Sequence, residues 1–274
     1  MIISIASGKG GTGKTTIAVN LSLSIPNVQL LDCDVEEPNS HIFIKPQIHT
    51  TVPVWIPVPD VDRSKCNYCG RCAEVCEYNA IAVLKDTVLV FPELCHGCGA
   101  CTSLCPQNAI KEINRQIGVI EIGTKADLQF GHGRLNIGEA MSPPIIRALK
   151  GYSNPARTVV IDAPPGTSCP VIESIKGSDY SILVTEPTPF GLNDLVLAVE
   201  VLRKLKIPFG VVINRSDLGN RDTHDYCKKE DIPILMEIPF RREIAVAYSK
   251  GTPLVEGFPE YKKEFFRMYE RVSK

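Results

Sequence analysis

The sequence has no excess of charge of either sign and no long run of apolar residues. Its 274 residues include 30 lysines and arginines against 31 aspartates and glutamates. This balance does not favour binding to a polyanion, so we expect no nucleic-acid partner. No apolar stretch approaches the roughly 20 residues that a membrane-spanning helix needs. The apolar start MIISIA runs straight into a glycine-rich loop, without a basic leader or cleavage site. A soluble globular protein is therefore expected.

Cysteine, by contrast, is abundant. There are 11 cysteines, and eight of them fall into two regular groups between residues 66 and 105. In a chain without a secretion signal, grouped cysteines indicate metal ligation in a reducing compartment rather than disulfide bonds. We therefore expect a cytoplasmic metalloprotein.

Short β-branched apolar runs alternate with helical stretches over most of the chain. Apolar residues recur at helical spacing over residues 15–24 and 192–205. The apolar runs end at polar residues, glycine or proline, as parallel strands covered on both faces do; they are MIISIAS, VQLLDCD, RTVVIDAP, YSILVTEP and PFGVVIN. The alternation predicts an α/β fold with a doubly wound, mostly parallel sheet.

A cysteine-rich stretch interrupts this rhythm. The spacing C-x2-C-x2-C-x3-C occurs at residues 66–76 and again 29 residues later at 95–105, and each copy leads into Asn-Ala-Ile. A repeat of this kind indicates a duplicated module. The following stretch INRQIGVIEIG is typical of a strand that returns to the main domain. We predict a discontinuous main domain of residues 1–56 and 120–274, with a small α+β domain of residues 57–119 inserted into it.

A phosphate-binding motif follows the first predicted strand. The pattern G-x-x-x-x-G-K-[ST] spans Gly8 to Thr15 and precedes a predicted helix. In such a loop, glycines let backbone N–H groups surround phosphate oxygens, and the helix N-terminus adds positive potential. Lys14 would reach the terminal phosphates, and the Thr15 hydroxyl would bind Mg²⁺. The motif predicts an ATP site formed by Gly8, Lys9, Gly10, Gly11, Thr12, Gly13, Lys14, Thr15 and Thr16.

The loop contains an additional lysine, Lys9, and with it the loop resembles that of a known family. SGKGGTGKTT resembles the deviant Walker A loop of the MinD/ParA/nitrogenase-iron-protein class of P-loop ATPases, which includes the Mrp-type iron-sulfur carriers. In that class the extra lysine reaches the nucleotide of the partner subunit. The resemblance implies an ATP-closed homodimer with Lys9 and Lys14 in the catalytic site. The alternative is that Lys9 is a solvated loop charge.

Further motifs of the same class follow in order. LLDCDVEEPN resembles its switch I, which implies that Asp34 orients the attacking water and that Asp32 supports the Mg²⁺ shell. VVIDAPPGT resembles its Walker B and switch II, which implies that Asp162 holds Mg²⁺ through water. Each carboxylate could instead cap a helix or turn, although a position directly after a buried strand favours function.

The base pocket is also indicated by resemblance. GVVINRSD places Asn214 where this class reads the adenine edge, with Arg215 beside it. Pro239, in EIPF, would form the other wall of that pocket.

The two cysteine runs resemble those of bacterial two-cluster ferredoxins, in which the fourth cysteine of each run binds the other cluster. The resemblance implies two 4Fe-4S clusters. One is bound by Cys66, Cys69, Cys72 and Cys105, and the other by Cys95, Cys98, Cys101 and Cys76. Paired cysteines also form zinc sites, but such sites do not need four cysteines at this spacing twice.

The three remaining cysteines are Cys33, Cys169 and Cys227. We expect Cys33 and Cys227 to pack in the core, as free cysteines commonly do. Cys169 lies seven residues after Asp162, and the nitrogenase iron protein has a cluster-binding cysteine at a comparable distance. Either Cys169 has no chemical role, or it lies near the dimer interface and binds a transferred cluster or a metal of the partner.

Two further segments give weaker indications of their role. The aromatic residues of YKKEFFRMYERVSK recur at roughly helical spacing. We expect this helix to dock on the ATPase core, and contact with a membrane is not favoured because Glu264 and Glu270 dilute its positive face. Residues 131–144, GHGRLNIGEAMSPP, have the composition of an interface loop, without an assigned role.

Two functions fit these features. In the first, ATP hydrolysis by a homodimer gates electron transfer from two 4Fe-4S clusters to a redox partner protein. In the second, ATP drives delivery of an iron-sulfur or metal cluster to an apoprotein, as in the Mrp-type carriers. Four-cysteine ligation argues against the ferredoxin-type clusters being the cargo, because a transferable cluster needs a weaker set of ligands.

Overall fold

Nine strands form one sheet in the computed structural model, which describes residues 1–273. Their order is β11-β10-β9-β1-β8-β2-β7-β6-β3, and neighbours from β11 to β7 run parallel. The five predicted strands are confirmed as β1 (Ile2–Ala6), β2 (Val28–Asp32), β8 (Thr158–Asp162), β9 (Tyr180–Thr185) and β10 (Phe209–Asn214). Two further strands, β11 (Ile234–Ile238) and β7 (Leu128–Leu135), were not predicted.

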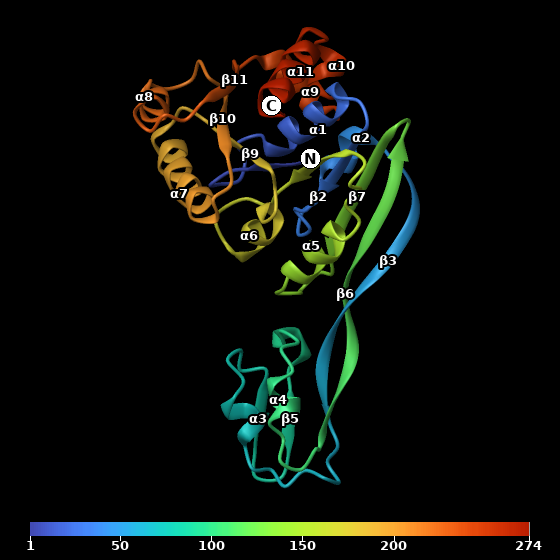
Figure 1. Cartoon of the computed structure of the whole chain (residues 1–274). Helices are drawn as coiled ribbons and strands as arrows, with labels where there is room; N and C mark the ends of the chain where they lie inside the picture. The colour runs from blue at the N-terminus through green and yellow to red at the C-terminus, as the bar shows by residue number, and fades with distance from the viewer. Residues whose placement is uncertain (274) are drawn as a thin grey trace.

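Helices cover both faces of the parallel strands. Successive side chains of a strand point to opposite faces, so Leu30 packs in one apolar layer and Leu31 in another. The first layer is covered by α1 (Lys14–Ser24), α2 (Ser40–Ile44), α9 (Arg242–Ser249), α10 (Leu254–Gly257) and α11 (Glu260–Val272). The opposite face is covered by α5 (Pro143–Lys150), α6 (Cys169–Ile175), α7 (Pro189–Leu205) and α8 (Asp222–Lys229). The sheet is therefore doubly wound, as predicted (Figure 1).

The C-terminal helix α11 docks on this body as expected. Phe265 is fully buried, and Tyr261, Met268 and Val272 are nearly so, in the layer that also contains α1. Within residues 1–273, no helix combines the length and the apolar character that crossing a membrane requires.

Two long antiparallel strands form one edge of the sheet and extend well beyond it. β3 (Gln47–Val61) pairs with β6 (Ile110–Lys125) along almost its whole length. β3 is the edge strand, which explains why it tolerates Pro53, Pro57 and Pro59, residues that lack the N–H a central strand would need. Figure 1 shows this pair as a twisted ribbon that leads away from the helices.

Part of the segment expected to be an interface loop is instead a strand, so that prediction was wrong for residues 131–135. Gly131 to Leu135 belong to β7, between β2 and β6. The reason is close packing: a Cβ at Gly133 would lie 2.6 Å from both Ile145 and Val35. Glycine and histidine are poor strand formers, so the strand depends on its neighbours in the sheet.

The cysteine-rich module lies at the far end of the ribbon, between Val61 and Ile110 (Figure 1). It contains α3 (Arg71–Glu74), the hairpin β4 (Ile81–Val83) and β5 (Val88–Val90), the 3-10 turn η1 (Pro92–Leu94) and α4 (Ala100–Ser103). The predicted domain boundary at residues 57 and 119 falls inside the paired arms of the ribbon. The division into domains stays a prediction.

Candidate functional site

The glycine-rich loop connects β1 to the N-terminus of α1. Gly11 and Gly13 have φ angles of +80° and +98°, a region that residues with a Cβ rarely adopt. Gly8 is needed for another reason, because a Cβ there would lie 2.1 Å from the carbonyl oxygen of Asp194 in α7. Lys14 is the first residue of α1 and is only 7% exposed. The loop thus aims helix N–H groups and one buried lysine at the same space.

That space is a cavity of about 480 Å³, a volume typical of a small-molecule site. Most of the predicted nucleotide residues line it. Gly8, Lys9, Thr12, Asp162 and Cys169 lie outside its lining. The predicted residues brought together there are Gly10, Gly11, Gly13, Lys14, Thr15, Thr16, Asp34, Asn214, Arg215 and Pro239.

Two aromatic residues of this cavity were not predicted from the sequence. Phe240 directly follows Pro239, and Tyr248 comes from α9. Both are nearly half exposed, and exposed aromatic residues beside a polar cavity can stack on a planar ring. The signal for Phe240 was its place after the predicted pocket wall, whereas nothing near Tyr248 in the sequence pointed to this site.

Three aspartates gather around Lys14. Asp32 accepts hydrogen bonds from the backbone N–H groups of Asp34 (3.1 Å), Asn39 (3.1 Å) and Ser40 (2.9 Å). In this structure Asp32 therefore fixes the predicted switch I loop by contacts with its backbone.

Asp162 has a free oxygen in this group. Its Oδ2 accepts a hydrogen bond from the Ser40 hydroxyl at 3.2 Å, but its buried Oδ1 has no partner among residues 1–273. Burial raises the pKa of Asp162 to about 8, and the charge of Asp32 adds to the rise. Burial also raises the pKa of Asp34 to about 6, while Lys14 opposes this rise. An orphaned carboxylate oxygen beside the Thr15 hydroxyl fits an oxygen-ligated cation such as Mg²⁺.

Asn214 is hydrogen-bonded to the phosphate loop in this structure. Its Nδ2 donates a hydrogen bond to the carbonyl oxygen of Thr12 at 2.9 Å, and its Oδ1 accepts one from the N–H of Arg215 at 3.0 Å. Arg215 in turn pairs with Glu186 at 2.8 Å. The end of β10 is thereby attached to the phosphate loop, and its role toward adenine stays a prediction.

We expect Gly13→Ala to destabilise the protein by about 1–3 kcal/mol. The alanine Cβ would lie 2.5 Å from Asn214 Nδ2, at a residue whose φ is +98°. Urea unfolding measures the decrease in the free energy of unfolding, and ATP titration should show weaker ATP binding. Gly10→Ala is the matched control in the same loop, because its Cβ would meet nothing closer than 4.0 Å. Equal stability of the two variants would contradict this reading of the loop.

The eight grouped cysteines separate into two sets that line two different cavities. Each set combines three cysteines of one run with the fourth cysteine of the other run. One cavity is lined by Cys66, Cys69, Cys72 and Cys105, and the other by Cys95, Cys98, Cys101 and Cys76. The structure therefore brings these side chains together in the combinations that the ferredoxin resemblance implies.

The two cysteine runs also share the same backbone conformation. Residues 29 positions apart share a left-handed conformation at Tyr68 and Gly97, at Gly70 and Gly99, and at Asn79 and Asn108. Backbone N–H groups also lie at the same distance from sulfur in both runs. The nitrogens of Tyr68 and Gly97 lie 3.4 Å from Sγ of Cys66 and Cys95, respectively. Those of Ala80 and Ala109 lie 3.3 Å from Sγ of Cys76 and Cys105. N–H donors of this kind stabilise charge on sulfur.

A zinc site and a 4Fe-4S cluster need different arrangements of thiols. Across residues 1–273, no three histidine, cysteine, aspartate or glutamate side chains stand close enough to share one metal ion. A tetrahedral zinc site needs four donors around a single ion, whereas each thiolate of a 4Fe-4S cluster binds a different iron. The assignment of 4Fe-4S clusters to the two four-cysteine cavities stays a prediction.

The other cysteines differ sharply in exposure. Cys33 and Cys227 are fully buried, and burial raises the pKa of both thiols. They pack in the core, as expected. Cys169 is exposed at the start of α6, directly after the loop that follows Asp162.

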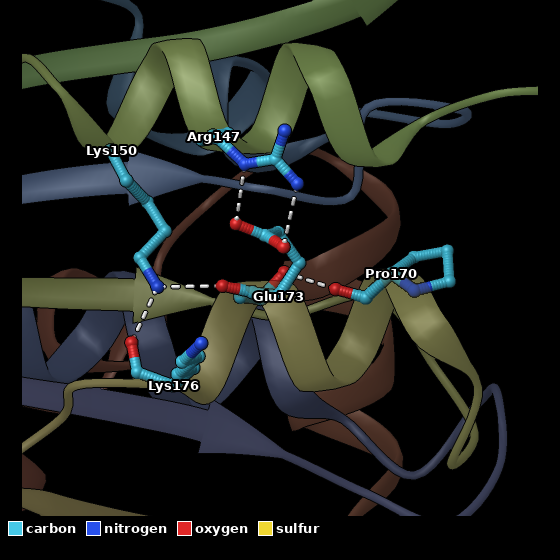
Figure 2. A network of polar contacts seen from close by, with 6 residues as sticks. Arg147, Lys150, Pro170, Glu173 and Lys176 are labelled. Carbon is cyan, nitrogen blue, oxygen red and sulfur yellow. Dashed lines mark hydrogen bonds and ion pairs between the residues drawn. The ribbon is translucent and has the colours of Figure 1, made fainter. Parts of the chain in front are cut away.

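A polar network attaches α6 to α5 on the face opposite α1. Arg147 binds both carboxylate oxygens of Glu173, each at 3.1 Å. Lys150 donates hydrogen bonds to the carbonyl oxygens of Glu173 (2.6 Å) and Lys176 (2.7 Å) at the C-terminal end of α6. Figure 2 shows these side chains reaching from α5 down to α6. The helix after the predicted switch II loop is therefore held at its C-terminal end.

Comparison with known proteins relates most of the chain to a single family. The family model "CobQ/CobB/MinD/ParA nucleotide binding domain" matches residues 3–254. The chain is 32% identical over 273 residues to an uncharacterised protein of Methanocaldococcus jannaschii, which covers 95% of this chain and 92% of the relative. It is also 27% identical over 266 residues to the iron-sulfur cluster carrier protein of Rickettsia typhi, covering 92% of this chain and 65% of the carrier.

The solved structures agree on the fold. The septum site-determining protein MinD of Pyrococcus horikoshii, solved in complex with Mg-ADP, is similar over 100% of this chain and 96% of its own, with a TM-score of 0.60 and 22% identity. At that identity the likeness concerns the fold alone.

Proposed function

Because this chain belongs to the CobQ/CobB/MinD/ParA family of nucleotide-binding domains, we propose that it hydrolyses ATP in order to deliver iron-sulfur clusters to a partner protein. The observation that carries the proposal is the presence in one chain of the phosphate-loop cavity and of two four-cysteine cavities. The name of the Rickettsia typhi relative supports cluster delivery over the electron transfer that the sequence analysis placed first.

The nucleotide roles follow from the cavity. The loop N–H groups and Lys14 bind the phosphates, and Asp34, which also lines the cavity, orients the attacking water. Thr15 and Asp162 hold Mg²⁺, which neutralises phosphate charge when bound. Lys9 lies outside this lining, so its ammonium group is available to the nucleotide of a second subunit in a homodimer.

The two four-cysteine cavities hold resident 4Fe-4S clusters in this proposal. Four thiolates and several N–H donors make a tight site, which is unsuited to a cluster that must leave. The cargo site is instead Cys169. Two copies of this exposed thiol, one from each subunit, would offer a weaker set of ligands beside the predicted switch II loop.

Cys169→Ser should therefore abolish cluster delivery while the protein keeps its resident iron and its ATPase rate. Iron transfer to an apoprotein acceptor measures the effect. Cys227→Ser serves as a control for cysteine replacement outside the cluster sites, since Cys227 is buried and distant in sequence from the predicted switch II loop. Unchanged transfer by the Cys169→Ser protein would remove this residue from the proposal.

ATP-gated electron transfer from the resident clusters is the second candidate. It is favoured by the two complete four-cysteine sets, which are typical of electron-carrying ferredoxins. The redox partner would then accept electrons and no iron.

One experiment separates the two candidates. The purified protein is reduced anaerobically, ATP and an acceptor protein are added, and both cluster oxidation and iron in the acceptor are followed. Iron transfer that requires ATP supports delivery. ATP-dependent oxidation with all iron retained supports electron transfer and would overturn delivery.

A further inference from the structure

Two buried aspartates lie side by side at the ends of neighbouring strands. Asp32 ends β2, Asp162 ends β8, and the two residues are paired in the register of the parallel sheet. Both residues are 0% exposed, so bulk solvent does not screen their charges. Like charges at such close quarters repel each other in a buried site. The pair therefore needs hydrogen-bond donors from the surrounding chain.

The two carboxylates receive donors of different kinds. Asp32 accepts hydrogen bonds from three backbone N–H groups of the predicted switch I segment and the residue after it. Oδ2 of Asp162 instead accepts its hydrogen bond from a side chain, the Ser40 hydroxyl. Oδ1 of Asp162 is buried and without a partner within residues 1–273. The orientation of the Asp162 carboxylate therefore depends on the Ser40 side chain.

Ser40 connects the two carboxylates to each other. It is 0% exposed, its N–H donates to Oδ2 of Asp32 at 2.9 Å, and its hydroxyl donates to Oδ2 of Asp162 at 3.2 Å. Any residue other than proline would supply the N–H at this position. The second bond needs a side chain with a donor of the right length. The serine hydroxyl therefore serves Asp162 rather than Asp32.

Packing of α2 fixes the place of this hydroxyl. Ser40 is the first residue of α2, and Phe43 and Ile44 of the same helix are buried in the apolar layer that contains α1. The ring of Phe43 lies 4.9 Å, between centroids, from the ring of Tyr248, which lines the nucleotide cavity. A side chain on a packed element is held more precisely than one on a loop. Ser40 is therefore already placed to orient Asp162.

We infer that Ser40 is a positioning residue of the Mg²⁺ site, whose hydroxyl binds Oδ2 of Asp162 and leaves Oδ1 for the cation or its water ligands. This inference rests on the proposed function, in which Asp162 holds Mg²⁺. Either oxygen of a carboxylate can face a cation, and a fixed donor on one of them decides which oxygen does. Partners that hold a metal-binding group in this way typically contribute about 10–100-fold to metal affinity.

The test uses Mn²⁺, a paramagnetic substitute for Mg²⁺, with the purified protein and ADP. The signal of free Mn²⁺ in electron paramagnetic resonance at room temperature measures how much has bound. Ser40→Ala should weaken Mn²⁺ binding by about tenfold or more. ADP binding in the presence of EDTA should not change, because the phosphates are bound by the loop and Lys14. Hydrogen exchange of residues 34–40 should also stay that of the wild type, since Asp32 still accepts the backbone N–H of residue 40.

Ser22→Ala is the matched control. Ser22 is a buried serine of α1 whose hydroxyl donates to the carbonyl oxygen of Ala18 at 2.8 Å, so the variant also loses a buried hydroxyl but should bind Mn²⁺ as the wild type does. Unchanged Mn²⁺ binding by the Ser40→Ala protein would overturn the inference. Faster hydrogen exchange of its residues 34–40 would do so too, because Ser40 would then act by holding the loop.

Failure of the proposed Mg²⁺ site would look different from failure of this inference. In that case the wild type would bind no Mn²⁺ in the presence of ADP, or Asp162→Asn would bind it as well as the wild type does. If Asp162 holds the cation and Ser40 orients it, Asp162→Asn should weaken Mn²⁺ binding more than Ser40→Ala. Loss of binding in Asp162→Asn alone, with Ser40→Ala unaffected, would keep the Mg²⁺ site and remove the role of Ser40.

Discussion

Replacement of Lys14 by alanine should reduce the ATPase rate by roughly 10²–10³-fold, while the iron content per chain stays that of the wild type. Lys14 is buried beside Asp162, Asp34 and Asp32, and their charges oppose the lowering of its pKa by burial. Without the ammonium group, the phosphates would meet carboxylates with one positive charge fewer to offset the repulsion. Nucleotide binding and hydrolysis should therefore both suffer.

The iron should stay because the cysteine module lies at the far end of the ribbon, apart from α1 and its phosphate loop (Figure 1). Its eight cysteines lie between residues 66 and 105, far in sequence from the phosphate loop. Phosphate release and iron analysis of the same preparation measure the two effects. Lys204→Ala is the matched control, a lysine that also lies on a helix but is exposed. Loss of iron from the Lys14→Ala protein would show that the two sites are not separable.

The second large effect concerns which cysteines share a cluster. Cys76→Ser should remove about half of the iron, because Cys76 lines the cavity of Cys95, Cys98 and Cys101. Cys95→Ser should remove the same cluster. The double variant Cys76→Ser/Cys95→Ser should therefore lose no more iron than either single variant, since both changes act on one site.

The complementary double variant supplies the contrast. Cys66 lines the other cavity, so Cys66→Ser/Cys76→Ser should lose nearly all the iron although both residues belong to one run. Iron and acid-labile sulfide per chain measure each variant. If each run held its own cluster, the two double variants would exchange results, and the cavity assignment would be wrong.

The sequence predicts this fold best where local signals and packing agree. The β-branched runs such as VVID and VVIN became buried parallel strands, because apolar side chains on both faces suit a covered sheet. The phosphate loop and the cysteine sets were predictable for a different reason. Their chemistry fixes residue type and spacing over a few positions, so the motif is visible without any long-range contact.

The parts of the fold and of the site that could not be predicted depend on contacts between distant segments. β7 contains Gly131, His132 and Gly133. The close approach of Val35 and Ile145 explains Gly133, and that of Ile122 and Leu31 explains Gly131. Tyr248 reaches the nucleotide cavity from α9 without a motif of its own. The pairing of Arg115 with Glu139 joins a strand to a loop. Single residues of this kind acquire meaning only from the tertiary structure.

The strand order has a consequence for how the chain is made. β1 pairs with β8 and β9, and β2 pairs with β7 and β8. A ribosome therefore completes the whole cysteine module before any strand partner of β1 or β2 exists, since β7 begins only at Leu128. Local units can form early, whereas long-range parallel pairing is slow. On the proposed function, a nascent chain would be able to acquire iron at the module before its nucleotide-binding sheet closes. Iron supply during translation and later nucleotide binding would then be separate stages of maturation.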